Sequence, residues 1–175
     1  MQTASDFQLD PDRHYEFVDG EWRVRQPQEF LHSRTLSRLN RHLGEFVDER
    51  RCGRIYLVCS YQIGADERII DLSYISAARI PPEGEPATKW MMPPDLAIEI
   101  ISSTDLHDDV YRRLNDYLRA EIKQVWLVNP FDQSILVYRS RTDITAFVDD
   151  AGLTCEDLLP GFCCRLSDIF IPNAI

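Results

Sequence analysis

The chain has 175 residues, of which 44% are hydrophobic and 27% charged, with a formal net charge of −10. This balance suits one globular domain with a hydrophobic core, not a disordered or fibrous chain. No apolar run approaches the roughly 20 residues that a membrane-spanning helix needs. The acidic charge also excludes a broadly basic DNA-binding surface, so any such face has to be a local patch.

The N-terminus and the cysteines indicate the compartment. Residues 1–12 are polar and acidic, unlike a signal or transit peptide. We expect them to be a lead-in before a single domain over residues 13–175. The five cysteines are odd in number and contain no CxxC pair, which favours free thiols over disulfides or a zinc site. These features predict a cytoplasmic protein with no membrane partner.

The first part of the chain predicts a hairpin, a long helix and a group of strands. Asp19-Gly20 between apolar residues predicts strands over 15–18 and 21–25. Apolar residues at helical spacing predict a helix over 29–50, which Gly53 ends. Further strands are expected at 54–59, 61–63 and 68–75. The proline-rich stretch from 77 to 94 reads as a loop, and its Trp90-Met-Met92 segment is a candidate cover for a site or a partner surface.

The second part predicts a strand–helix–strand unit. An apolar strand over 95–101 is followed by Ser102-Ser-Thr-Asp105, which offers N-cap chemistry for a helix over 106–120. A strand at 124–128 comes next, and this order fits a parallel right-handed crossover. Strands at 134–138 and 142–148 and a short helix at 167–170 complete the chain. The fold class is therefore α/β (α+β), with a mixed sheet in one domain.

Two carboxylates lie in strands where charge is unfavourable. Glu99 stands inside an apolar strand and Asp71 inside another β-rich run, and a buried, unpaired carboxylate costs several kcal/mol. Acidic residues on neighbouring strands can share one Mg²⁺ or Mn²⁺ ion through hard oxygen ligands. Such a metal polarises a phosphodiester and activates water. The alternative is that Glu99 faces water on an edge strand and Asp71 only begins a strand.

Several stretches in a fixed order resemble the Uma2 family (DUF820), whose members have the PD-(D/E)XK restriction-endonuclease-like fold. The resemblance covers about residues 13–172. The matching stretches are Tyr15-Glu-Phe-Val-Asp-Gly-Glu21, His32, Arg68-Ile-Ile-Asp-Leu-Ser-Tyr-Ile75, Pro94-Asp-Leu-Ala-Ile-Glu-Ile-Ile-Ser102, Gln124-Val-Trp-Leu-Val-Asn-Pro130 and Leu159-Pro-Gly-Phe162.

The resemblance implies roles for particular residues. Asp71 occupies the motif aspartate position and Glu99 that of the second metal carboxylate. Ile101 stands where the classical motif has lysine, and Arg113 stands on the following helix, where family variants carry that lysine. Ile70 replaces the motif proline. Arginine stabilises a phosphorane but does not readily act as a base, so the motif is degenerate.

Two functions follow from this comparison. The first is a Mg-dependent endonuclease, a hydrolase of DNA phosphodiester bonds, with Asp71, Glu99 and Arg113 as catalytic residues. The alternative is a catalytically inactive nuclease-fold protein that acts by partner binding or self-association. We expect a homodimer under either hypothesis, because nucleases of this fold often act in pairs.

Other residues allow two interpretations each. Glu16 is a third candidate metal ligand, but an exposed hairpin carboxylate is the simpler interpretation. His32 could contact a phosphate or relay a proton, or simply begin the long helix. Arginines on two helices could form the local basic patch, and a solvated face is the simpler interpretation for the first helix. These arginines are Arg34, Arg38, Arg41, Arg112 and Arg113.

Structural roles are expected for the remaining candidates, which are Tyr117, Trp126, Asp95, Ser102 and Ser103.

Overall fold

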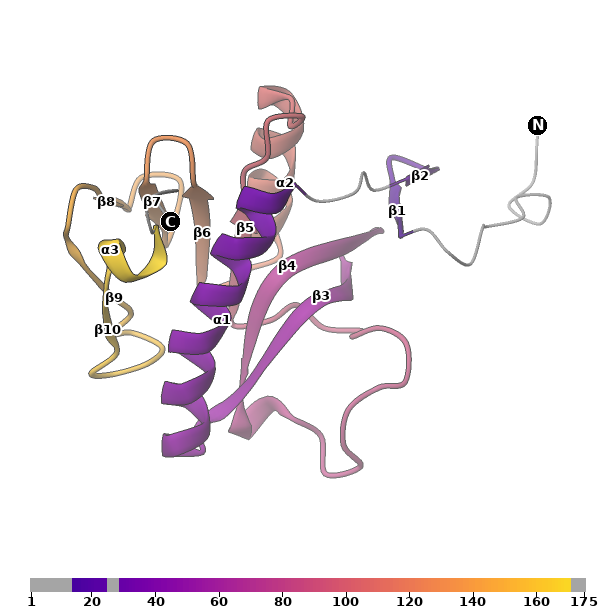
Figure 1. The fold of residues 1–175 in the computed structure, drawn as a ribbon. Helices are drawn as coiled ribbons and strands as arrows, with labels where there is room; N and C mark the ends of the chain where they lie inside the picture. The colour runs from indigo at the N-terminus through magenta and orange to yellow at the C-terminus, as the bar shows by residue number, and fades with distance from the viewer. Residues whose placement is uncertain (1–13, 25–28, 171–175) are drawn as a thin grey trace.

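The structure, a computed structural model, describes residues 14–24 and 29–170 (Figure 1). The lead-in expected over residues 1–12 and the end of the second strand at residue 25 lie outside these ranges. The predicted class is confirmed, because a large mixed sheet carries helices on both faces. Within the described ranges, no helix is long and apolar enough to cross a membrane.

The main sheet follows the order β2-β1-β4-β5-β6-β7-β8, and β3 also pairs with β4. Its strands are β1 (Tyr15–Val18), β2 (Glu21–Val24), β3 (Gly53–Ile63), β4 (Asp66–Ser76), β5 (Leu96–Ile100), β6 (Gln124–Asn129), β7 (Ser134–Tyr138) and β8 (Ile144–Phe147). A small second sheet joins β9 (Gly152–Thr154) and β10 (Cys163–Arg165). The helices are α1 (Phe30–Arg50), α2 (His107–Arg119) and α3 (Leu166–Ile169), with a 3-10 turn η1 (Ala77–Arg79).

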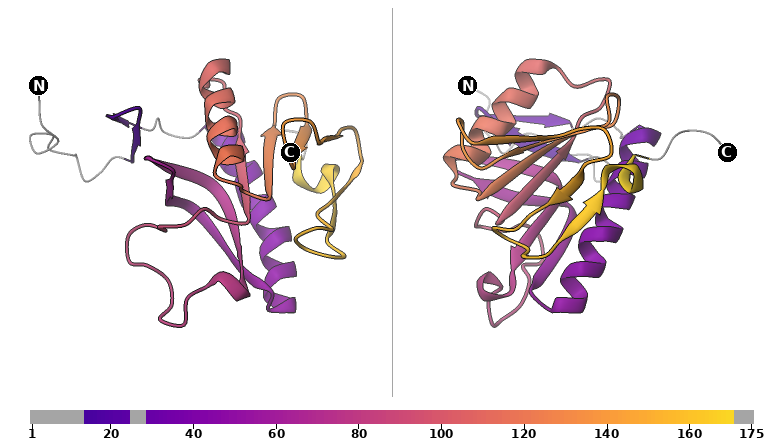
Figure 2. Two further views of the ribbon diagram at one scale, coloured as in Figure 1. Left: turned by 180° about the vertical axis from the view of Figure 1, so that it is seen from behind. Right: turned by 90° about the vertical axis from the view of Figure 1, so that its left-hand side faces the viewer.

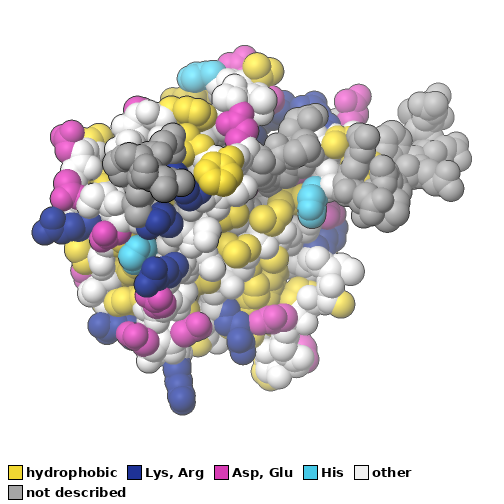
Figure 3. Space-filling view, in the orientation of Figure 1, with side chains coloured by type: hydrophobic (Ala, Val, Ile, Leu, Met, Phe, Trp, Pro, Cys, Tyr) yellow, Lys and Arg dark blue, Asp and Glu magenta, His cyan; other side chains and the backbone are white. Residues whose placement is uncertain are grey.

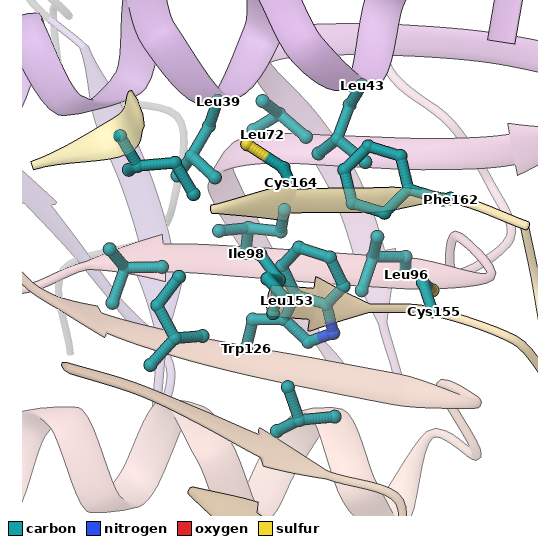
Figure 4. Close-up of a cluster of buried hydrophobic side chains, with 14 of the residues drawn as sticks. Leu39, Leu43, Leu72, Leu96, Ile98, Trp126, Leu153, Cys155, Phe162 and Cys164 are labelled. Atoms are coloured by element: carbon teal, nitrogen blue, oxygen red, sulfur yellow. The ribbon is translucent and has the colours of Figure 1, made fainter. Parts of the chain in front are cut away.

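Helices α1 and α2 lie on opposite faces of the sheet (Figure 2), and a hydrophobic cluster lies under each of them. The first lies under α1, where Leu39, Leu43 and Val47 recur at helical spacing and pack against β4, β5 and β6. Figure 4 shows this cluster, in which the Trp126 side chain lies at the centre. The second cluster lies under α2 and includes Tyr117. Because both faces are covered, all five residues of β5 are buried.

The predicted crossover is confirmed by the parallel pairing of β5 with β6, with α2 between them in the chain. The hairpin at Asp19-Gly20 is also confirmed. Two details were wrong. The strands expected at 54–59 and 61–63 form one strand, β3. The serines at 102 and 103 do not cap α2: its N-cap is Leu106, without a side-chain cap, and Asp108 and Asp109 offset the helix dipole instead.

The expectation that Trp90 covers a site or a partner surface was also wrong. Trp90 is buried, with its ring 5.5 Å from that of Tyr56. Its backbone pairs with β3, accepting from the Gln62 N–H at 2.8 Å and donating to the Ser60 carbonyl at 3.0 Å. Met91, the next residue, is exposed. The long segment between β4 and β5 is therefore anchored to the sheet near its end by this residue.

Candidate active site

Asp71 and Glu99 come together through the pairing of β4 with β5. The antiparallel register ends at the pair Leu72–Ile98, so Asp71 and Glu99 each lie one residue beyond it on adjacent strands. Asp71 is 1% exposed and Glu99 is 2% exposed. The alternatives of a strand-start Asp71 and a water-facing Glu99 are thus wrong, since Asp71 is mid-strand and β5 is central.

Both oxygens of Glu99 are engaged by α2. The Tyr117 hydroxyl donates to Oε1 at 2.7 Å, and the Arg113 Nε atom lies 3.3 Å from Oε2. Burial and the neighbouring carboxylate of Glu99 raise the pKa of Tyr117 well above its usual value, so this hydroxyl stays protonated as a donor. Arg113, predicted at this site, thus lies beside Glu99, and Tyr117, expected to be a core residue, also contacts Glu99.

Arg113 is shared between two acids. Its Nη2 atom donates to Asp105 Oδ1 at 2.9 Å, while Asp105 Oδ2 accepts from the Ser102 N–H at 2.9 Å. Burial alone would lower the pKa of Arg113, but Glu99 and Asp105 outweigh it and raise that pKa. Arg113 is therefore a permanent cation that cannot serve as a base. Asp105, expected to be part of a helix cap, instead orients this cation.

Asp71 is held from two sides. Its Oδ2 atom lies 3.0 Å from His32 Nε2 and accepts from the Ile100 N–H at 2.9 Å. His32 is buried in the first turn of α1, so its contact with Asp71 ties α1 to the site. On the other neighbouring strand, Val58 stands opposite Asp71 with a φ of 51°. This conformation is a rare outlier for a β-branched residue, and such strain tends to concentrate at functional sites.

Of these groups, Glu99, Arg113 and His32 line a pocket of about 190 Å³ between the β1–β2 hairpin, α1, β5 and the start of α2, whereas Asp71 is not among its described lining residues. Its lining includes Glu16, His32, Arg68, Glu99 and Arg113. Glu16 is only partly exposed and accepts from the Ile69 N–H at 3.0 Å. The simpler interpretation of Glu16, a fully exposed hairpin carboxylate, is therefore wrong. The pocket is smaller than usual ligand pockets, which suits a hydrated ion and one phosphate group.

The donor set limits which metal could bind. Asp71 and Glu99 supply two buried carboxylates from adjacent strands, and Arg113 lies 3.3 Å from Glu99 Oε2. Within residues 14–24 and 29–170, no three His, Cys, Asp or Glu side chains are grouped to hold a metal ion. The site therefore does not fit a closed cage such as structural zinc requires. It fits Mg²⁺, which is bound by one or two carboxylates and keeps several waters.

The other predicted residues differ in their place. Arg112 lines the pocket and contacts Asp109 and the hairpin residue Asp19. Asp95 is buried away from it, paired with Arg79 and Lys123. Arg68, which the sequence analysis did not single out, is 2% exposed and paired with Asp116. Burial was the missing signal, because periodicity alone does not show that a charged strand residue faces inward.

A mixed sheet with paired carboxylates on adjacent strands and a cation from the following helix defines a nuclease-fold protein. The chain belongs to the Uma2 family, described as "putative restriction endonuclease", which it matches over residues 3–167. Among solved structures, a DUF820 protein from Anabaena variabilis ATCC 29413, described as a putative nuclease, is similar with a TM-score of 0.83. Its identity is 23%, over 93% of each chain. No curated protein matches. The family description supports a nuclease-like function.

Proposed function

We propose that this protein is a metal-dependent endonuclease that hydrolyses DNA phosphodiester bonds. The observation that carries the proposal is that Asp71 and Glu99 are buried on adjacent strands, and that Glu99 and Arg113 line one pocket. Asp71 and Glu99 would hold Mg²⁺ or Mn²⁺. A divalent ion there supplies charge neutralisation and a more acidic bound water.

The chain's own residues prepare this site for a phosphate. The Ile100 N–H and His32 fix the Asp71 carboxylate, and the Tyr117 hydroxyl fixes that of Glu99. Arg113 offsets the charge that develops on the phosphorane, because a guanidinium is a fixed cation with directed donors. Neither Arg113 nor Ile101 can accept a proton from water. We therefore propose a slower enzyme than one with the motif lysine.

The test is metal binding and DNA cleavage by matched single variants. Glu99→Gln and Asp71→Asn keep the shape of each side chain but remove its charge. Each is expected to weaken Mg²⁺ or Mn²⁺ binding in calorimetry. Each should also lower the cleavage rate at least about a hundredfold, because one charge that holds the metal is lost. Glu83→Gln, an exposed loop acid, is the control and should change neither. Cleavage that survives loss of both site carboxylates would contradict the proposal.

A second function is favoured by the contacts of Glu99. Both its oxygens already have protein partners, so an inactive nuclease-fold protein that binds a partner or self-associates is the alternative. Arg113→Lys separates the two. It restores the lysine of family variants, and an active site should then keep or gain cleavage. If the protein is inactive, neither wild type nor Arg113→Lys should bind Mg²⁺ or Mn²⁺ at millimolar metal concentrations.

A further inference from the structure

The outer face of α1 carries a local basic surface on an acidic protein. Residues 30–44 contain no Asp or Glu, although the whole chain has 29 acidic residues. The surface, here called the α1 face, follows one side of the helix and borders a hollow. It consists of Phe30, Ser33, Arg34, Ser37, Arg38 and Arg41. Dark-blue side chains lie along this part of α1 in Figure 3.

The α1 face adjoins the candidate active site. His32 lines the site pocket, and Ser33 on the next position lines the hollow of the α1 face. Glu29, immediately before the helix, accepts from the Ser103 hydroxyl, in the loop that follows β5. The pocket and the α1 face therefore share the first turn of α1.

The side chains of the α1 face are of the kinds that bind a sugar–phosphate backbone. Arginine and small hydroxyl residues are among the side chains that contact phosphates in protein–DNA complexes. Arg41 pairs with Glu45 at 3.1 Å, but the two side chains are 72% and 61% exposed, so water and salt screen this pair and phosphate can replace it. Phe30 is 80% exposed, and the Arg34 guanidinium lies 6.0 Å from its ring centroid. An exposed ring near cations is typical of surfaces on which bases stack.

We propose that the α1 face binds the phosphodiester backbone of the nucleic acid whose scissile phosphate enters the pocket. The inference rests on the proposed function, since it names the surface that holds the same substrate outside the site. Charge complementarity selects the partner: the face is basic, whereas the chain as a whole carries a net charge of −10.

The test measures DNA binding by fluorescence anisotropy with EDTA present, so that cleavage plays no part. The triple variant Arg34→Gln, Arg38→Gln, Arg41→Gln is compared with wild type at several salt concentrations. Each lost phosphate contact should reduce the slope of log K for DNA binding against log salt concentration by about 1. The slope of the triple glutamine variant should therefore be smaller than that of wild type by about 2–3. Arg34→Lys, Arg38→Lys, Arg41→Lys keeps the charge and should stay near the wild-type slope.

A second triple controls for net charge. Arg54→Gln, Arg119→Gln, Arg141→Gln removes the same charge from exposed arginines elsewhere and should keep most of the slope. Equal losses in the two glutamine triples, or no DNA binding by wild type, would overturn the proposal. The proposal would also be overturned if the α1-face glutamine triple loses self-association but binds DNA as wild type does. If DNA binding follows the α1 face but Glu99→Gln leaves cleavage intact, the surface stands and the metal-site assignment fails.

Discussion

Glu99 depends on partners that the strand itself cannot provide. Its neighbours along β5 are apolar, so the compensating groups, Tyr117 and Arg113, come from α2. A carboxylate this buried is stable only when hydrogen-bonded and paired. The side chains that make Glu99 tolerable are therefore also those that fix its geometry for chemistry.

Removing the Tyr117 hydroxyl isolates this effect. Tyr117→Phe keeps the ring and leaves a buried carboxylate oxygen without its donor, so we expect a loss of about 1–3 kcal/mol in the free energy of unfolding. Urea denaturation measures it. Tyr61→Phe is the matched control, because Tyr61 is equally buried but bonds the neutral Ser73 hydroxyl at 2.6 Å. Its loss should be smaller, about 1 kcal/mol. Equal losses would mean that the Glu99 bond has no special strength.

At the scale of elements, the segment between β4 and β5 is fixed by few side chains. Trp90 adds a short parallel bridge to Tyr61 on β3 and fills the cluster under α2. Met91 is 71% exposed, while Met92 and Ile80 are only partly buried against the same cluster. Trp90 is thus the largest buried side chain that holds this segment.

Truncating the anchor tests this description. Trp90→Ala should lower the free energy of unfolding by about 3–5 kcal/mol, because a large buried ring is lost and a cavity remains. Met91→Ala, one residue away, should change it by less than about 0.5 kcal/mol. Urea unfolding of both variants provides the comparison. Similar values for the two would show that Trp90 is not the anchor of this segment.

At the scale of the whole molecule, periodicity was sufficient for most elements and for the pairing of β5 with β6. The placement of Asp71 and Glu99 within strands was also predictable, because a charge within an apolar strand is visible in the sequence. The side chains that contact them were not predictable. Tyr117 and Asp105 come to Glu99 and Arg113 through tertiary contacts, and Val58 adopts its conformation opposite Asp71 only within the assembled sheet. Trp90 was misjudged for the same reason, since a proline-rich segment gives no signal of burial.

The molecule also contains two acids whose pairing links its stability to pH. Burial alone would raise the pKa of Asp95, but Lys123, the Ser76 N–H and Arg79 outweigh burial and lower it. For Asp105, burial is likewise outweighed by the Ser102 N–H and Arg113, and its pKa is lowered. A folded-state pKa below the unfolded value of about 3.9 means that the contribution is complete above that value. It is lost as the pH falls through the folded-state pKa.

We therefore expect the free energy of unfolding to decline below about pH 4, with part of the slope from Asp95. Asp95→Asn cannot titrate, so its slope should be shallower by up to about 1.4 kcal/mol per pH unit. Lys123→Met leaves Asp95 able to titrate but removes its partner at 2.8 Å. The pKa of Asp95 then rises toward its unfolded value, so the loss of stability at low pH should be smaller and should end at a higher pH. Urea unfolding between pH 2 and 7 distinguishes these outcomes, and parallel curves for all three proteins would rule out Asp95 as a source of acid sensitivity.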